Sequence, residues 1–211
     1  MGASGLIGSK LLNILLNANE YEQVISIGRK KTKRNHRKLQ QHVVDFDNAR
    51  TYDDLIKADA AFCCLGTTKK QTPNTDEYYK IDHDYPVNIA ITAAKNKVSQ
   101  FHFVSAIGAD STSGNFYLKT KGQTENDLIK QHLSSLYIYQ PSLLTGRSKN
   151  RRIGERIGAA IMWAVNPLLI GGLKKYRSIP AQKVAMAMFK QSLLNKEGVF
   201  TFTSEQIHNI A

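Results

Sequence analysis

Short apolar runs alternate with segments of helical periodicity along the first two thirds of the chain. Runs rich in Val, Ile, Phe and Tyr predict strands, and the periodic segments between them predict helices. The expected strands are Val24–Ile27, His42–Val44, Ala60–Leu65, Gln100–Ser105 and Leu136–Tyr139, and the expected helices are Lys10–Leu16, Tyr52–Ile56, Pro86–Lys95 and Tyr117–Gln131. This alternation favours an α/β fold, a doubly wound parallel sheet with helices on both faces. Ligands of such sheets bind beyond the carboxyl ends of the strands.

The pattern changes after Pro141. The segments that follow are a basic stretch, an apolar stretch interrupted by Asn166 and Pro167, and an amphipathic helix: Arg147–Arg156, Ile157–Leu173 and Pro180–Leu194. This does not look like another regular strand–helix unit, so we expect residues 142–211 to contribute a small cap over a substrate pocket. Because no internal repeat or low-complexity linker occurs, residues 1–211 are expected to form one domain.

A glycine motif, Met-Gly-Ala-Ser-Gly-Leu-Ile-Gly, opens the chain. Glycines at positions 2, 5 and 8 let the backbone turn tightly and approach a pyrophosphate, and the next helix aims its free N–H groups at that phosphate. The motif therefore predicts dinucleotide binding. In a doubly wound fold it follows the central strand, whereas here it follows one methionine. We expect either about five to eight further apolar residues before Gly2, with Met1 ending that strand, or another segment in the gap.

The end of the second strand bears on the choice of cofactor. An enzyme selective for NAD usually has Asp or Glu there, but this chain has Gly28 followed by Arg29. A guanidinium suits a 2′-phosphate, which predicts NADP, with NADPH preferred over NADH. Lys30 would assist or be solvated. After the third strand, Asp45 would accept from the adenine amino group beside Phe46, or would cap a turn.

The fourth strand ends in Cys-Cys-Leu-Gly-Thr-Thr. Backbone at Gly66 can pass close to a cofactor, and Thr67 or Thr68 can bond its ribose or phosphate. Cys63 and Cys64 are neighbours whose side chains point to opposite faces of a strand, so a disulfide between them is not expected. With no other cysteines, the sequence predicts a reducing, cytoplasmic location.

Tyr117 and Lys121 have the spacing that places a phenol and an ammonium on one face of a helix. The ammonium is expected to lower the pKa of the phenol, which makes Tyr117 a candidate proton donor and acceptor. Ser105 ends the preceding strand and could hydrogen-bond a substrate carbonyl, although a turn serine would look the same. Ser111 and Ser113 are competitors for that role.

The net charge of +12 is concentrated in the run Arg29–Lys38. A solvated loop, a nucleic-acid patch and a site for an extra phosphate are the alternatives. The run lacks aromatic residues, and the sequence contains no helix-turn-helix or zinc spacing, so no specific nucleic-acid partner is expected. The apolar stretch Ile157–Leu173 is flanked by basic residues, which suggests a membrane-peripheral protein, but Asn166 and Pro167 interrupt it.

These motifs together resemble the atypical short-chain dehydrogenase/reductases, in particular their Tat-interacting-protein-like branch. The likeness runs from the glycine motif through Cys-Cys-Leu-Gly-Thr-Thr and the segment around Tyr117 to Tyr-Gln-Pro-Ser-Leu-Leu. It implies a Rossmann fold, NADP binding and catalytic roles for Ser105, Tyr117 and Lys121. The candidate cofactor-binding residues are Gly2, Ser4, Gly5, Leu6, Ile7, Gly8, Arg29, Lys30, Asp45, Phe46, Leu65, Gly66, Thr67, Thr68, Lys121 and Pro141. Gln140 and Ala106 depart from the family, which usually has Arg and a second serine there.

The expected function is an NADP-dependent oxidoreductase that acts on a small carbonyl or alcohol substrate. Tyr117 would donate a proton, Ser105 would stabilise the oxyanion, and Lys121 would hold the ribose and the tyrosine. The alternative is a non-catalytic NADP-binding sensor with a protein partner. A monomer or a homodimer is compatible with the sequence, and no metal is expected.

Overall fold

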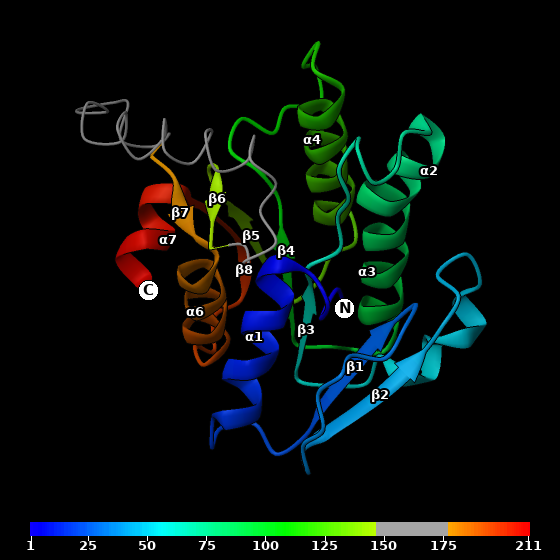
Figure 1. Cartoon of the computed structure of the whole chain (residues 1–211), viewed down its shortest axis with the longest axis vertical. Helices are drawn as coiled ribbons and strands as arrows, with labels where there is room; N and C mark the ends of the chain where they lie inside the picture. The colour runs from blue at the N-terminus through cyan, green and yellow to red at the C-terminus, as the bar shows by residue number, and fades with distance from the viewer. Residues whose placement is uncertain (147–176) are drawn as a thin grey trace.

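The computed structural model describes residues 1–146 and 177–211. Its largest sheet has four parallel strands in the order β3 (Ala60–Cys63), β4 (Gln100–Val104), β5 (Ser135–Gln140) and β8 (Gly198–Thr203). Two parallel pairs accompany it, β1 (Val24–Gly28) with β2 (Leu39–Val43) and β6 (Leu144–Thr145) with β7 (Ile179–Pro180). Figure 1 shows β1 and β2 beside β3. The expected α/β architecture is confirmed.

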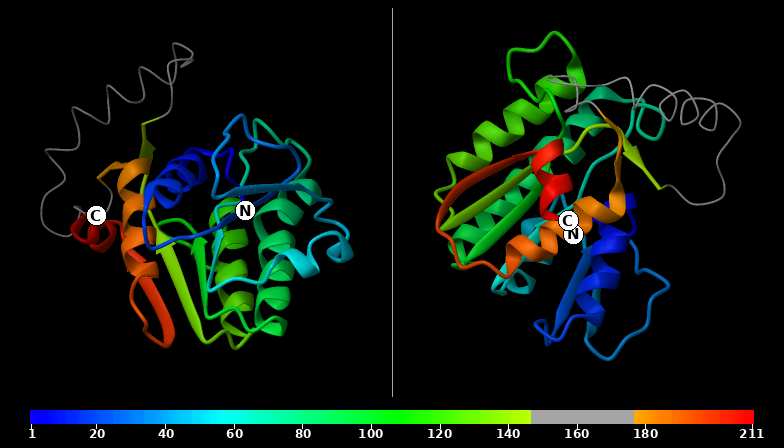
Figure 2. Two further views of the ribbon diagram at one scale, coloured as in Figure 1. Left: turned by 90° about the horizontal axis from the view of Figure 1, so that it is seen from below. Right: turned by 90° about the vertical axis from the view of Figure 1, so that its left-hand side faces the viewer.

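Helices cover both faces of the sheet (Figures 1 and 2). One layer contains α1 (Leu6–Asn17), α6 (Ala181–Ser192) and α7 (Ser204–Ile210), and the other contains α2 (Thr75–Tyr79), α3 (Tyr85–Lys95) and α4 (Phe116–Ile129). Each layer closes its own core, because Leu11 and Met188 are buried on the first face and Ile89 and Leu128 on the second. The apolar stripes of these amphipathic helices therefore supply the two cores.

One expected helix is wrong. The segment Tyr52–Ile56 instead contains one short 3₁₀ turn, Asp53–Leu55, which follows another, Ala49–Thr51. Asn48 starts the first turn by accepting from the Arg50 amide, and Asn96 ends the second by donating to the carbonyl oxygens of Asp53 and Ile56 at 2.7 and 2.9 Å. These side-chain bonds satisfy backbone groups that a longer helix would have paired.

The C-terminal part contains the amphipathic helix expected over Pro180–Leu194, observed as α6, and after it a strand that the sequence pattern did not indicate. Helix α6 leads into β8, which pairs in parallel with β5. The rings of Phe200 and Phe202 stack on Tyr137 and Tyr139 at 5.1 and 5.3 Å, which fixes the register of this edge strand. The described part of residues 142–211 thus extends the sheet and one helix layer. Arg147–Arg156 and Ile157–Leu173 lie outside the described residues, so the substrate cap stays a prediction.

The sheet is interrupted between β1 and β3. No strand of residues 1–146 or 177–211 lies between them, and β1–β2 forms a sheet separate from β3–β4–β5–β8. Met1 alone occupies the end of this gap: its nitrogen donates to the Phe62 carbonyl at 2.7 Å, and its carbonyl accepts from the Cys64 amide at 3.1 Å. The gap is at the position where the glycine motif led us to expect a central strand.

Candidate cofactor and substrate site

The glycine motif forms a tight loop in front of α1. Gly2 has φ +77°, and a Cβ there would lie 2.4 Å from the Cys64 carbonyl oxygen. A Cβ at Gly8 would lie 2.1 Å from the Gly2 oxygen, to which the Gly5 amide donates at 2.9 Å. Side chains are therefore excluded where the backbone closes on itself.

The N-terminus of α1 is left open by this loop. Gly5 is the N-cap residue, with extended backbone, and no side chain caps the helix. Ser4 and Gly5 are exposed, whereas Leu6 is half-buried and Ile7 packs in the core. Free N–H groups and a cradle without side chains are what a pyrophosphate requires. The residues therefore fit a dinucleotide, with Ile7 contributing backbone only.

A buried ion pair lies beyond the carboxyl ends of β3 and β4. The Nζ of Lys121, on α4, is 3.0 Å from Oδ1 of Asp82, and the two side chains are 4% and 1% exposed. The other carboxylate oxygen, Oδ2, accepts from the Thr67 amide at 2.8 Å. Burial alone would lower the pKa of Lys121, but the Asp82 carboxylate and its hydrogen bond outweigh it, so the pKa is raised. Lys121 is thus a fixed, charged group.

Tyr117 precedes Lys121 by one turn of α4 and is 38% exposed. Burial raises the pKa of the Tyr117 phenol, the Lys121 ammonium lowers it, and the Asp82 charge raises it again, leaving it above its ordinary value. Lys121 lowers the pKa of the phenol, as expected, but the two opposing effects are together larger. The largest cause of the raised pKa is the partial burial of the phenol, and the charge of Asp82 adds to it.

Ser105 is buried at the end of β4 and points at a second carboxylate. Its hydroxyl donates to Oε1 of Glu125, and Gln140 Nε2 lies 3.0 Å from both Glu125 oxygens. Burial raises the pKa of Glu125, opposed by these hydrogen bonds and by the charge of Lys121. Ser105 is therefore already engaged by a protein acceptor, which the sequence did not indicate.

The two competing serines have local partners. The Ser111 hydroxyl accepts from Asn126 Nδ2 at 3.1 Å, and the Ser113 hydroxyl accepts from the Asn115 amide at 3.2 Å. The second contact stabilises the turn just before α4, whose N-cap is Asn115. Of the three serines, Ser105 is the one that bonds to Glu125. We call Asp82, Lys121, Ser105, Glu125 and Gln140 the polar cluster.

The loop after β3 lies against the ion pair. A Cβ at Gly66 would lie 3.4 Å from Asp82 Oδ1 and 3.9 Å from Lys121 Nζ. The Thr67 hydroxyl is paired with Thr72 at 2.8 Å, and Thr68 is exposed. The loop also touches the glycine motif, through Gly2 and Cys64. The glycine loop, the Lys121–Asp82 ion pair and Tyr117 therefore lie at the same end of the sheet.

Leu65 and Pro141 flank the polar cluster at the ends of two strands. Leu65 is half-buried and packs against the core on the α3–α4 face. Pro141 is buried, and its carbonyl accepts from the Ile107 amide at 3.0 Å. Both residues hold loops at strand ends in place, and a contact of their backbone with the cofactor stays a prediction.

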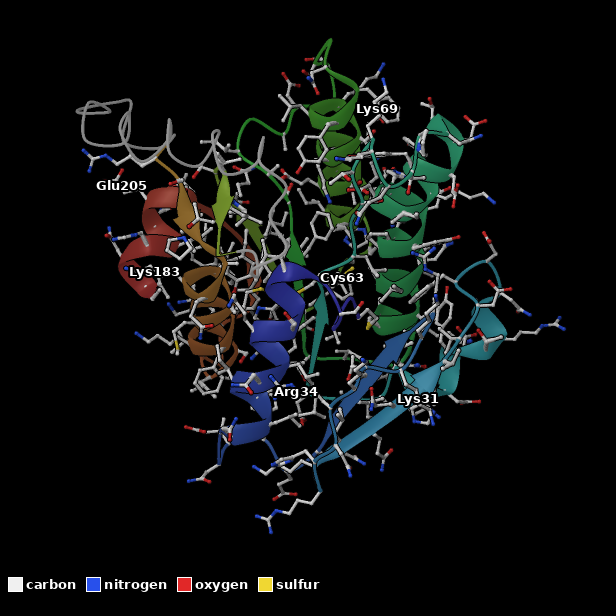
Figure 3. The ribbon with its side chains drawn as sticks, viewed as in Figure 1. Lys31, Arg34, Cys63, Lys69, Lys183 and Glu205 are labelled. Carbon is white, nitrogen blue, oxygen red and sulfur yellow. The ribbon has the colours of Figure 1, made fainter. Side chains whose placement is uncertain are left out.

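The residues expected to bind the adenosine half of the cofactor lie at the ends of β1 and β2. Arg29 and Lys30 are exposed, and the continuing basic run lies on the β1–β2 side of the molecule, as Lys31 and Arg34 show in Figure 3. Their exposure leaves them free to meet a phosphate.

The next two candidates have structural partners. An Asp45 side-chain oxygen accepts from the Asp47 amide at 3.0 Å, which is the turn-capping role. Phe46 is 4% exposed and stacks on Tyr85 at 5.4 Å, so its ring belongs to the core. The cofactor contacts assigned to them stay predictions.

Asp82, Glu125 and Gln140 complete the site and were not among the expected site residues. Glu125 could have been found, because it follows Lys121 by four residues and so shares its helix face. Asp82 lies in a π turn, Lys80–Asp84, which no sequence signal marks. Gln140 was visible as a departure from the family's arginine, and the structure shows that its amide reaches Glu125.

Comparison with known proteins identifies the relatives of this chain. A family model described as NAD(P)H-binding matches residues 2–163. The chain belongs to the NAD(P)H-binding family. It is 32% identical over 159 residues to Protein HTATIP2 of Rattus norvegicus, covering 74% of this chain and 65% of that protein. It is 31% identical over 163 residues to the mitochondrial Protein FMP52 of Debaryomyces hansenii, covering 74% and 71%. These relatives confirm the resemblance to the Tat-interacting-protein-like branch.

Solved structures show the same fold at low sequence identity. The Bordetella bronchiseptica enzyme WbmH, in complex with NAD+, has a TM-score of 0.70 and 16% identity over 96% of this chain and 73% of its own. UDP-glucuronic acid 4-epimerase from Bacillus cereus, in complex with NAD, has a TM-score of 0.70 and 15% identity over 96% and 76%. At such identities the likeness concerns the Rossmann architecture alone.

Within the described ranges, no helix has the length and hydropathy to cross a bilayer. The relatives named FMP52 are described as mitochondrial, so the cytoplasmic location stays a prediction.

Proposed function

We propose that this family member is an NADP-dependent oxidoreductase that interconverts a small carbonyl compound and its alcohol. The observation that carries the proposal is an exposed phenol, Tyr117, one helical turn from a buried, charged Lys121, at the sheet end that also carries the glycine loop. Bound NADPH supplies the hydride in such chemistry.

Each side chain has a distinct role in this proposal. Tyr117 donates a proton to the carbonyl oxygen, and its raised pKa keeps the phenol protonated for that step. Lys121 is held by Asp82, so its ammonium provides a fixed positive charge next to the reacting atoms. Ser105 turns its hydroxyl from Glu125 to the developing oxyanion. Arg29 binds the 2′-phosphate and thereby selects NADPH.

A non-catalytic NADP-binding sensor is the second candidate. The contact of Ser105 with Glu125 favours it, because the hydroxyl is already donated to a carboxylate. In that case the polar cluster would keep the strand ends rigid, and a surface near the bound cofactor would meet a protein partner.

Tyr117→Phe separates the two candidates. The substitution removes the proton donor and leaves the ring, so we expect turnover of a carbonyl panel with NADPH to be lost while NADPH affinity stays near that of the parent. Tyr79→Phe is a matched control, because Tyr79 is the last residue of α2, stacks on His83 in the π turn and is not part of the polar cluster. Retained turnover in Tyr117→Phe would remove the catalytic proposal and leave the sensor.

A further inference from the structure

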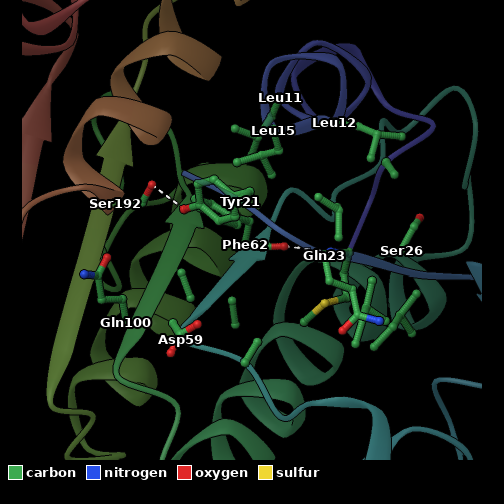
Figure 4. Close-up of a pocket in the computed structure, with 18 of the residues that line it drawn as sticks. Leu11, Leu12, Leu15, Tyr21, Gln23, Ser26, Asp59, Phe62, Gln100 and Ser192 are labelled. Carbon is green, nitrogen blue, oxygen red and sulfur yellow. Dashed lines mark hydrogen bonds between the residues drawn. The ribbon is translucent and has the colours of Figure 1, made fainter. Parts of the chain in front are cut away.

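The polar cluster is separate from the cavity between β1 and β3. That cavity has a volume of about 720 Å³, and Leu11, Leu15 and Phe62 are among the residues that line it (Figure 4). The polar cluster lies instead where α4 packs against the ends of β4 and β5. The hydrogen bonds within the cluster determine which of its groups can donate a proton to a ligand.

Glu125 continues the line of site residues along α4. It follows Tyr117 by eight residues and Lys121 by four, so the three side chains follow one another along one side of the helix. The end of β4 lies beside them: the Val104 carbonyl accepts from Lys121 Nζ at 3.4 Å, and the next residue, Ser105, donates to Glu125. The hydroxyl assigned to the oxyanion is therefore a direct neighbour of the Glu125 carboxyl.

A serine hydroxyl has a single proton to donate. An ionised Glu125 carboxylate can only accept, so Ser105 gives it this proton and presents lone pairs elsewhere. A carbonyl oxygen that becomes negative would then meet lone pairs instead of a donor. When the carboxyl carries a proton, its own O–H can donate to the Ser105 oxygen, and the serine proton is free for the substrate.

The groups that face Glu125 in the described part of the chain are neutral, apart from Lys121. From β5, the amide of Gln140 reaches both carboxyl oxygens at 3.0 Å, and from β4 comes the hydroxyl of Ser105. The ammonium of Lys121, on the same helix, is paired with Asp82 of the π turn at 3.0 Å. Burial therefore raises the pKa of Glu125, against these two hydrogen bonds and the charge of Lys121.

We propose that Glu125 is a positioning residue that acts through Ser105: the protonated carboxyl donates to the Ser105 oxygen and turns the serine hydroxyl toward the carbonyl oxygen of the substrate. The ionised carboxylate holds the hydroxyl as the structure shows it, and the site then lacks its oxyanion donor. No proton leaves Glu125 in this role, since the alcohol receives its proton from Tyr117. This role rests on the proposed oxidoreductase function.

Glu125→Gln tests the role, because an amide imitates the protonated acid at every pH. Its N–H group can donate to the Ser105 oxygen, and its oxygen can accept from Gln140. With NADPH and a panel of carbonyl compounds, we expect kcat/KM of the parent chain to fall as pH rises through the pKa of Glu125. Over that range kcat/KM of Glu125→Gln should stay constant.

Two control variants accompany this measurement. Ser105→Ala removes the donor itself and should lower kcat by about a hundredfold, in the parent chain and in Glu125→Gln alike. Glu205→Gln changes an exposed carboxyl on α7, in the other helix layer, and should keep the pH profile of the parent.

NMR of the labelled carboxyl carbon follows Glu125 without turnover. With NADPH present, we expect its titration midpoint to lie above the ordinary value for a glutamate and to coincide with the midpoint of the fall in kcat/KM. The midpoint should rise further in Ser105→Ala, which removes a donor to the carboxylate. Gln140→Arg should lower both midpoints, because a guanidinium stabilises the ionised form.

Three outcomes would overturn the proposal: a folded Glu125→Gln that keeps the parent's fall with pH, one that loses as much turnover as Ser105→Ala, or kinetic and NMR midpoints that differ. If Glu125→Gln does not fold, Gln140→Arg decides, by lowering the kinetic midpoint or leaving it in place. If the parent chain reduces no carbonyl compound at any pH, the proposed function fails. The NMR titration then decides the role of Glu125, since a midpoint that Ser105→Ala raises supports the coupling and an unmoved one refutes it.

Discussion

Removing the charge of Asp82 is expected to destabilise this protein more than any surface ion-pair substitution. Asp82→Asn keeps an oxygen that can accept from the Thr67 amide, so the change isolates the ion pair with Lys121. The ammonium would then remain 4% exposed, over the ring of Phe103 at 4.9 Å, with no counter-charge beside it. Breaking a buried pair from one side typically costs about 3–5 kcal/mol, because it leaves a desolvated charge.

The magnitude can be checked against a matched exposed pair. Lys57 and Asp54 form an ion pair at 2.9 Å, but their side chains are 62% and 93% exposed. Water and salt screen such an exposed pair, so Asp54→Asn should change the free energy of unfolding little. Against a total of roughly 5–15 kcal/mol for a domain, the Asp82 substitution alone would consume a large fraction of the stability.

Urea denaturation measures the stability of both variants and of a double variant that also lacks the lysine. We expect a large fall in the midpoint for Asp82→Asn and almost none for Asp54→Asn, with similar m-values. Adding Lys121→Met to Asp82→Asn should recover most of the loss, because the unpaired charge is gone. The reasoning fails if Asp82→Asn costs no more than Asp54→Asn, or if the double variant is as unstable as the sum of its single changes.

Two further predictions concern acid stability and cofactor choice. Burial lowers the pKa of His102 from 6.5 to about 3, so its stabilising contribution is complete above pH 6.5 and is lost as pH falls toward 3. At pH 5 the free energy of unfolding should therefore be about 2 kcal/mol lower than at neutral pH on account of His102. The urea midpoint of His102→Gln should fall less than that of the parent chain between neutral pH and pH 5. An equal fall in both would contradict this prediction. Arg29→Ala should weaken NADPH binding by roughly 1.5–3 kcal/mol in a fluorescence titration and spare NADH; equal weakening of both would contradict the assignment.

The frame of the fold was predictable because local patterns determine it. The strand Gln100–Ser105 and the helix Pro86–Lys95 were expected within one residue of the observed bounds, Gln100–Val104 and Tyr85–Lys95. Apolar β-rich runs and a proline in the first helical turn are signals carried by neighbouring residues. The 3₁₀ turn Asp53–Leu55 was not predictable, because its end is held by Asn96, which is distant in sequence.

The candidate site also has residues that the sequence predicted and residues that it could not predict. Tyr117, Lys121 and the glycine loop were identified because fixed spacings carry their geometry. Asp82 could not be paired with Lys121 from the sequence, because the contact spans two helices and a π turn. Burial of the phenol also could not be predicted from the spacing, and it is the largest cause of the raised pKa of Tyr117, to which the Asp82 charge adds.

The two carboxylates of the cluster differ in what faces them. Asp82 is met by an ammonium, whereas Glu125 is met by the neutral donors of Ser105 and Gln140, with Lys121 contributing charge only from farther away. An arginine at position 140 would place a full positive charge on Glu125 and hold it ionised. The glutamine satisfies its oxygens without that charge, so burial raises the pKa of Glu125. The side chain at position 140 on β5 therefore bears on the pKa of a carboxyl group on α4.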